Sequence, residues 1–165
     1  MKGKLVMDFT VDETTNTVNI SREFNAGKDL VWRAWTEAKM LDQWWAPKPY
    51  VNKTKSMDFT EGGRWLYSMT SPEGESHLCF VDYFSISEKE NFKYKDAFCD
   101  SEGNITDFPD AKWNIRFTEK GGHTMVSIQI THDSAETLQK YLEMGFKEGF
   151  TTGLNQLGKL LATLK

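Results

Sequence analysis

The chain has 165 residues, and its 24 acidic and 20 basic side chains give a formal net charge of -4. This length suits one domain that removes roughly 70% of its unfolded surface from water, and the acidic balance argues against a nucleic-acid partner. No apolar run is as long as a bilayer span, which needs about 18 residues, and the N-terminus lacks the apolar core of a secretory signal. We therefore expect a cytoplasmic protein with no membrane span.

Aromatic side chains are more abundant than a core of this size usually needs. The sequence contains six Trp, five Tyr and eleven Phe residues. Such rings dominate the energetics of cores and binding surfaces alike. We expect much of this aromatic set to line a surface other than the packed core.

The first residues predict a β-hairpin. Apolar and mostly polar side chains alternate from Lys4 to Val11 and again from Val18 to Phe24. This is the period of a half-buried strand, and the polar residues 12–16 between the two segments are typical of a turn.

Residues 25–45 change to helical spacing and predict two short helices. Asn25 is a suitable N-cap for the first helix, and Thr36 is one for the second. Pro47 and Pro49 end this region, because proline cannot continue a helix.

A long run of strands is predicted next. Successive segments have strand periodicity, and glycine-rich turns separate several of them, which indicates an antiparallel meander. The segments are 51–59, 64–71, 77–86, 90–99, 111–118 and 124–131.

The chain is predicted to end in one helix from about Ser134 to Leu164, roughly 45 Å long at 1.5 Å per residue. Ser134 is its expected N-cap. Strands followed by a long helix define an α+β fold.

Three glycines recur at a spacing of four within this last helix, at 145, 149 and 153. Each should cost the helix about 1 kcal/mol relative to alanine. They share one face with Leu138, Leu142 and Gln156, so this face is expected to lie against the sheet. Two explanations fit the pattern: glycine allows close packing, or the missing side chains leave an apolar cavity under the aromatic residues of the sheet.

Three motifs occur in the order found in a known family: "ISREFNAGKDLVWRAWTEAKMLDQWWAPK" (20–48), "DFTEGGRWLYSM" (58–69) and "LEMGFKEGFTTGLNQLGKLLA" (142–162). Together they resemble bacterial homologues of the C-terminal domain of the activator of heat shock protein 90 ATPase. That family belongs to the START-like (SRPBCC, helix-grip) superfamily. The resemblance covers about residues 18–162.

The resemblance implies a curved antiparallel sheet that grips a long C-terminal helix around a cavity. We expect residues 1–165 to form a single START-like domain in which an extra N-terminal strand precedes the family-like region. The superfamily contains lipid and hormone binders, polyketide cyclases and the chaperone activator, so the fold alone does not select an activity. The larger N-terminal domain by which the eukaryotic activator docks on its chaperone has no counterpart here.

Motifs of nucleophilic, metal and phosphate chemistry are absent from the sequence. Cys79 and Cys99 lack CxxC spacing and are interpreted as reduced core thiols. His77, His123 and His132 are far apart in sequence and are interpreted as surface or hydrogen-bonded residues. No metal and no cofactor are therefore expected. The residues favour a binding protein over an enzyme and leave the question of catalysis open.

Three charged residues on strands, Arg64, Asp82 and Asp96, are expected on the solvent face unless they find a partner or orient a ligand. His77 with Asp82 or Asp96 is the one constellation suited to acid–base work of the cyclase kind. His77 and Asp96 are accordingly candidate polar groups of a pocket.

The leading hypothesis is the binding of a small hydrophobic or aromatic ligand between the sheet and the C-terminal helix. The alternatives are a chaperone cofactor or protein-interaction module, for which one ring of the Trp44–Trp45 pair could face a partner, and a cyclase-like or hydrolase-like enzyme. The predicted cavity-lining residues are aromatic or apolar residues of the sheet and short helices together with the helix face: Trp44, Trp45, Trp65, Tyr67, Met69, Tyr94, Trp113, Leu142, Gly145, Gly149 and Gly153.

Overall fold

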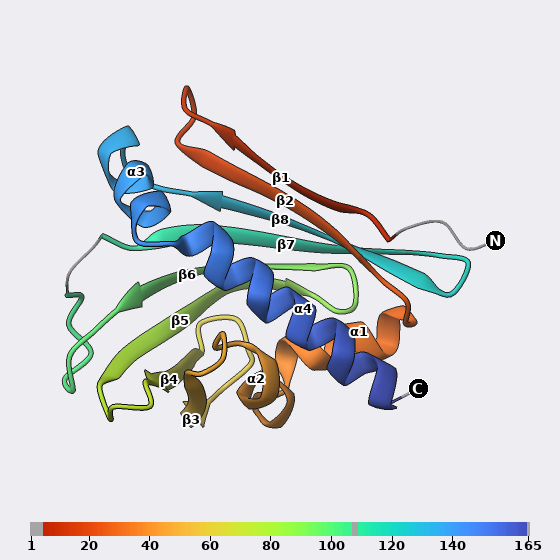
Figure 1. Ribbon diagram of the computed structural model, residues 1–165, viewed down its shortest axis with the longest axis horizontal. Helices are drawn as coiled ribbons and strands as arrows, with labels where there is room; N and C mark the ends of the chain where they lie inside the picture. Colours follow the sequence, from red (N-terminus) through yellow and green to blue (C-terminus); the bar gives the residue numbers. More distant parts are fainter. Residues whose placement is uncertain (1–4, 107–108, 165) are drawn as a thin grey trace.

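The computed structural model describes residues 5–106 and 109–164, which form one eight-stranded sheet and four helices (Figure 1). In chain order the elements are β1 (Met7–Asp12), β2 (Thr17–Phe24), α1 (Lys28–Thr36), α2 (Ala38–Trp44), β3 (Val51–Met57), β4 (Arg64–Thr70), β5 (Ser76–Ser87), β6 (Asn91–Phe98), β7 (Ala111–Lys120), β8 (His123–Thr131), α3 (Ala135–Glu143) and α4 (Phe146–Leu164).

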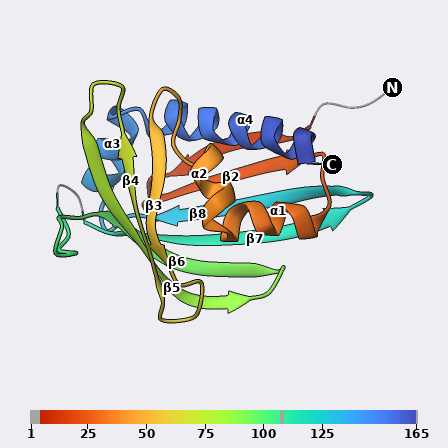
Figure 2. The ribbon, with the colours of Figure 1, turned by 90° about the horizontal axis from the view of Figure 1, so that it is seen from below.

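The strands pair in the order β1-β2-β8-β7-β6-β5-β4-β3, and every pairing is antiparallel. The sheet curves around α1 and α2, and α4 crosses its concave side (Figure 2). This arrangement confirms the predicted α+β helix-grip fold. The predicted N-terminal hairpin is also confirmed, with Met7 opposite Arg22, while Lys4 lies outside the described residues.

The concave face of the sheet is packed with aromatic rings at the end that α1 covers. Trp32 of α1 meets the rings of Phe92 and Phe117 edge-on, at centroid separations of 5.6 and 5.1 Å. Trp35, one turn further along α1, meets Trp44 of α2 at 4.7 Å. Edge-to-face pairs of this kind add to the stabilisation that burial of the rings already provides.

Both short helices begin later than predicted. The N-cap of α1 is Gly27 instead of Asn25, and the N-cap of α2 is Glu37 instead of Thr36. The Thr36 hydroxyl donates a hydrogen bond to the Trp32 carbonyl at 2.8 Å, so its side chain completes the last turn of α1 and does not cap α2.

The predicted single C-terminal helix is wrong, because the chain breaks at Gly145 into α3 and α4. Gly145 has a φ of +94°, and nothing lies within 4 Å of where its Cβ would be. Glycine is needed there for its backbone conformation, which ends α3 in the manner of a C-terminal glycine cap. The expected cap at the other end is present: the Ser134 side chain accepts a hydrogen bond from the Thr137 amide.

The other two glycines of the predicted stripe lie within α4 and differ from one another. A Cβ at Gly153 would lie 3.3 Å from the Trp44 carbonyl oxygen, so this glycine permits close packing of α4 on the end of α2. A Cβ at Gly149 would meet only Pro47, at an ordinary 3.7 Å.

Gln156 reinforces the contact between α4 and α2. Its side-chain amide donates to the carbonyls of Trp44 and Ala46 at 3.0 and 2.9 Å, and its oxygen accepts from the Lys48 amide at 2.8 Å. These hydrogen bonds satisfy backbone groups at the C-terminal end of α2, which have no partner within that helix.

Leucine substitutions should distinguish the structural roles of the two glycines within α4. Gly153→Leu should lower the free energy of unfolding by about 1–3 kcal/mol, because its side chain must displace backbone carbonyls. Gly149→Leu, the same exchange one turn earlier, should change it by less than about 1 kcal/mol. Urea denaturation of both variants measures this difference, and equal losses would contradict the packing described for Gly153.

Candidate functional site

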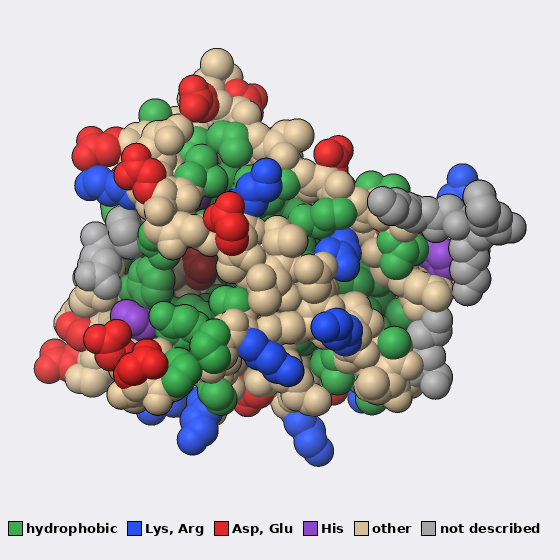
Figure 3. Space-filling model, viewed as in Figure 1, with side chains coloured by type: hydrophobic (Ala, Val, Ile, Leu, Met, Phe, Trp, Pro, Cys, Tyr) green, Lys and Arg blue, Asp and Glu red, His purple; other side chains and the backbone are tan. Residues whose placement is uncertain are grey.

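A cavity of about 510 Å³ lies between the concave face of the sheet and the junction of α3 with α4. Its wall comes from the turn after α2, from strands β4 to β8 and from the two last helices. Figure 3 shows a hollow rimmed by hydrophobic side chains, with an acidic side chain at its base. The residues that line the cavity are Trp45, Pro47, Tyr50, Tyr67, Met69, His77, Cys79, Asp96, Ala97, Phe98, Ala111, Trp113, Ile130, His132, Tyr141, Met144, Gly145, Phe146, Gly149 and Phe150.

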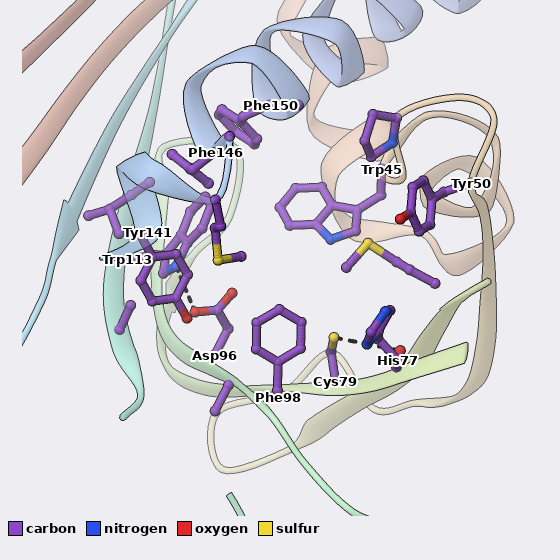
Figure 4. Close-up of a pocket in the computed structure, with 18 of the residues that line it drawn as sticks. Trp45, Tyr50, His77, Cys79, Asp96, Phe98, Trp113, Tyr141, Phe146 and Phe150 are labelled. Carbon is purple, nitrogen blue, oxygen red and sulfur yellow. Dashed lines mark hydrogen bonds between the residues drawn. The ribbon is translucent and has the colours of Figure 1, made fainter. Parts of the chain in front are cut away.

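Aromatic rings form most of the upper wall (Figure 4). The rings of Phe146 and Phe150 stack 5.3 Å apart on α4, and Phe150 also meets Trp45 and Trp113 edge-on at 6.0 and 5.6 Å. The Trp45 indole N–H donates to the Tyr67 hydroxyl at 3.1 Å. These contacts fix the Trp45 ring across the space that Gly149 leaves without a side chain.

Asp96 supplies the carboxyl group of the cavity wall. It lies on β6 in the inward-facing row with Tyr94 and Phe98, and its Oδ1 accepts a hydrogen bond from the Trp113 indole N–H at 2.9 Å. Burial raises the pKa of Asp96 to about 7, the nearby Asp110 carboxylate adds to this effect, and the Trp113 hydrogen bond opposes it. The carboxyl is half-buried, since protein surrounds it on most sides and the cavity reaches it on the remaining one.

The other polar groups of the wall favour their neutral forms. Burial raises the pKa of both the Tyr67 hydroxyl and the Cys79 thiol, and it lowers the pKa of the His132 imidazole. Nδ1 of His132 is buried without a hydrogen-bond partner among the described residues, and its ring lies 4.6 Å from that of Tyr141.

The structure brings many of the predicted site residues into one wall. The predicted residues that line the cavity are Trp45, Tyr67, Met69, Trp113, Gly145, Gly149 and the polar pair His77 and Asp96. Asp96 lies in the inward row of β6 and has a partner in the Trp113 indole, which is the condition under which a charged strand residue was expected away from the solvent face.

Five predicted residues lie outside the wall. Trp44 is only 1% exposed, and its indole N–H donates to the Ala34 carbonyl at 2.9 Å, so the pair Trp44–Trp45 presents no exposed ring to a partner. Trp65 stacks on Tyr67 at 4.1 Å, on the side away from the cavity, and Tyr94 stacks on Trp113 at 5.4 Å. Gly153 is covered by α2, as described above. Leu142 packs against the hydrophobic core.

Sequence reasoning missed residues that reach the cavity from turns and from distant elements. Tyr50 follows α2, and Tyr141 and Met144 come from the end of α3, whose direction depends on the break at Gly145. Tyr50, His77 and Met144 are exposed as well as cavity-lining and therefore mark its opening. Phe146 and Phe150 could have been recognised from the sequence, because each directly follows one of the glycines of this helix face.

The acid–base constellations considered from sequence do not form. Asp82 faces the outer side of the sheet, where its carboxylate pairs with Arg64 at 2.6 Å. Asp96 is paired with Val81, which lies four residues along β5 from His77. Since a strand rises about 3.3 Å per residue, the two candidate groups are separated by about 13 Å along the strand.

The described ranges contain no cluster of three or more His, Cys, Asp or Glu side chains that could hold a metal ion. None of the helices in the described part of the chain combines the length and apolar character that a bilayer span requires. Cys79 and Cys99 are free and buried, in agreement with their interpretation as core thiols.

An antiparallel sheet wrapped around a C-terminal helix, with a cavity between them, defines a START-like helix-grip protein, a type of fold used for ligand binding. Residues 25–162 match the family model of Activator of Hsp90 ATPase homolog 1-like proteins, and the chain belongs to this family. The comparison with curated proteins finds no match.

Solved structures agree with this assignment. Protein Ms6760 from Mycobacterium smegmatis is similar at 32% identity with a TM-score of 0.87, over 96% of this chain and 97% of the other. A protein from Arthrobacter aurescens is similar at 26% identity with a TM-score of 0.90, over 94% and 91% of the two chains. The AHSA1 protein from Silicibacter pomeroyi, at 16% identity, shares the fold with a TM-score of 0.72 over 90% and 99% of the two chains.

The raised pKa of Asp96 predicts a specific pH dependence of stability. The pKa of its carboxyl is near the ordinary value of 3.8 when the chain is unfolded and about 7 when it is folded, so the native state binds more protons between these values. The contribution of this carboxyl to the free energy of unfolding is fully present at acid pH and is lost as the pH rises toward about 7. The free energy of unfolding of Asp96→Asn should equal that of the wild type near pH 4 and exceed it near pH 8.

Urea unfolding of both proteins across this range measures the effect, and comparison of the two curves removes the contributions of all other groups. A difference in the free energy of unfolding that is constant with pH, or that shrinks toward pH 8, would contradict the shifted titration.

Proposed function

We propose that this protein binds a small hydrophobic or aromatic molecule in the cavity between its sheet and α4. The observation that carries the proposal is the largely apolar cavity of about 510 Å³, lined by the rings of Trp45, Trp113 and Phe150. Ligand pockets commonly measure about 300–1,000 Å³ and combine apolar walls with a few polar groups. Asp96, His77 and Tyr67 supply such polar groups here.

The position of the glycines supports the same conclusion. Gly149 lines the cavity, and a Cβ there would meet only Pro47, so the missing side chain leaves open space along this part of α4. A helix of this length tolerates the weaker propensity of glycine because its later turns bury Leu154, Leu157 and Leu161.

The other two hypotheses have less support. The family is named for an activator of Hsp90 ATPase, but the tryptophan pair considered as a docking surface is buried in this chain. A cyclase-like reaction would need an acid and a base close together, and His77 and Asp96 are separated along the sheet.

Uptake of the neutral fluorescent probe N-phenyl-1-naphthylamine tests the proposal. The wild type should give saturable fluorescence enhancement with one site per chain. Gly149→Leu should abolish it while preserving the circular dichroism spectrum, because the leucine side chain projects into the cavity and fills part of it.

Gly158→Leu is the matched control on the same helix. A Cβ at Gly158 would meet only the end of the Arg22 side chain, at 3.7 Å and away from the cavity. This variant should bind the probe as the wild type does. Unchanged probe binding by Gly149→Leu, or no saturable binding by the wild type, would rule out the proposed site.

A further inference from the structure

The charges of the cavity wall are asymmetric. Asp96 is its acidic residue, and no lysine or arginine belongs to the wall as far as the chain is described. The remaining ionisable groups are two imidazoles, of which His132 is buried, together with tyrosine hydroxyls and the Cys79 thiol. An anionic ligand such as a fatty acid would therefore place its carboxylate near Asp96 without a cationic partner from the wall.

Within the described ranges, a side-chain hydrogen bond reaches one oxygen of the Asp96 carboxyl. Oδ1 accepts the Trp113 indole N–H at 2.9 Å, and Oδ2 has no side-chain donor in residues 5–106 or 109–164. A carboxyl in apolar surroundings is costly unless a charge or hydrogen-bond donor reaches it. Because the open side of Asp96 faces the cavity, a ligand is positioned to supply that donor (Figure 4).

The walls around this carboxyl suit an organic cation. Phe98 adjoins Asp96 on β6, and Trp113 and Trp45 enclose the space above it (Figure 4). Aromatic faces attract ammonium groups through the ring quadrupole, whereas aliphatic walls only desolvate them. The rest of the cavity accepts a hydrocarbon or aromatic body.

We propose that the cavity selects apolar amines, whose protonated nitrogen pairs with Asp96 while the aromatic wall encloses the body of the molecule. This inference rests on the proposed ligand-binding function and specifies its ligand class. The ammonium group donates a hydrogen bond to Oδ2. The ion pair forms inside the cavity, away from bulk water, and hydrogen bonds between charged groups are strong there.

Binding should strengthen with pH, because Asp96 must lose its proton while an alkylammonium keeps its own up to about pH 10. Among the groups that face Asp96, burial raises the pKa of Tyr67, Cys79 and Tyr94, which remain neutral in this range. Burial lowers the pKa of His132, and its neutral form adds no repulsion. The neighbouring carboxylate of Asp110 pairs with the Lys95 ammonium at 3.7 Å. Two further ionisable groups of the wall are His77, which lies at the opening of the cavity, and Tyr141, which lies on α3.

A matched series of three probes tests the inference: 2-(1-naphthyl)ethylamine, 2-(1-naphthyl)ethanol and 1-naphthylacetate, titrated by calorimetry at pH 8. The amine should bind at least about tenfold more tightly than the alcohol, as expected for a hydrogen bond to a charged group, and the acetate most weakly. The preference for the amine over the alcohol should shrink at pH 5.

Asp96→Asn should lower the affinity for the amine by about tenfold and leave that for the alcohol within about twofold. Asp82→Asn is the control, because it removes the same charge from the outer face of the sheet, where Asp82 pairs with Arg64. It should change neither affinity by more than about twofold.

The outcomes separate the two proposals. Binding of the alcohol without any preference for the amine, or a preference that survives Asp96→Asn, would overturn the amine inference and leave the cavity as a general apolar site. Tighter binding of the acetate would overturn it as well. Failure of all three probes to bind would overturn the proposed function and this inference together.

Discussion

The contact between α4 and the end of α2 is the interaction on which the cavity depends. Gly153 allows the α4 backbone to approach the Trp44 carbonyl closely, and Gln156 bonds to the carbonyls of Trp44 and Ala46. This contact anchors α4 at its leucine-rich half. The first turns of α4 are then held over the sheet by large rings, and the space beneath Gly149 is not closed by collapse of the helix. Trp45, the next residue after α2, is positioned by the same contact and forms the opposite wall.

The break at Gly145 gives the cavity its opening. In a continuous helix, α3 would share the axis of α4. The left-handed backbone at Gly145 instead lets α3 take a different direction from α4. Tyr141 and Met144 thereby reach the cavity from one side while His77 and Tyr50 reach it from the other. Asp96 lies at the base of this space, with one hydrogen bond from Trp113 and a pKa of about 7 set by burial. A carboxyl that lies among rings and faces the cavity is well suited to recognising a ligand group.

The sequence predicted the architecture well because strand periodicity and turn chemistry are local. It also located Gly149, Trp45 and Trp113 on surfaces that face one another. It could not distinguish the roles of the three glycines, since Gly145 continues the spacing of Gly149 and Gly153 although its φ is positive. Likewise, Asp96 was a candidate polar group of a pocket, but the general rule that charges avoid apolar positions favoured the solvent face, and the sequence did not reveal its Trp113 partner. The positions of the Trp44 and Trp65 side chains depend on contacts between distant segments. No local sequence pattern distinguishes a core tryptophan from one that lines a cavity.

The central claim is that the space between α4 and the sheet is kept open and apolar for a guest. A crystal structure of the protein under xenon pressure tests it most directly, because xenon enters apolar cavities without needing a specific ligand. A xenon atom is expected in contact with Trp45, Trp113 and Phe150, and none is expected there in Gly149→Leu. A structure with no open space beside Trp45, Trp113 and Phe150, and no xenon atom there, would contradict it.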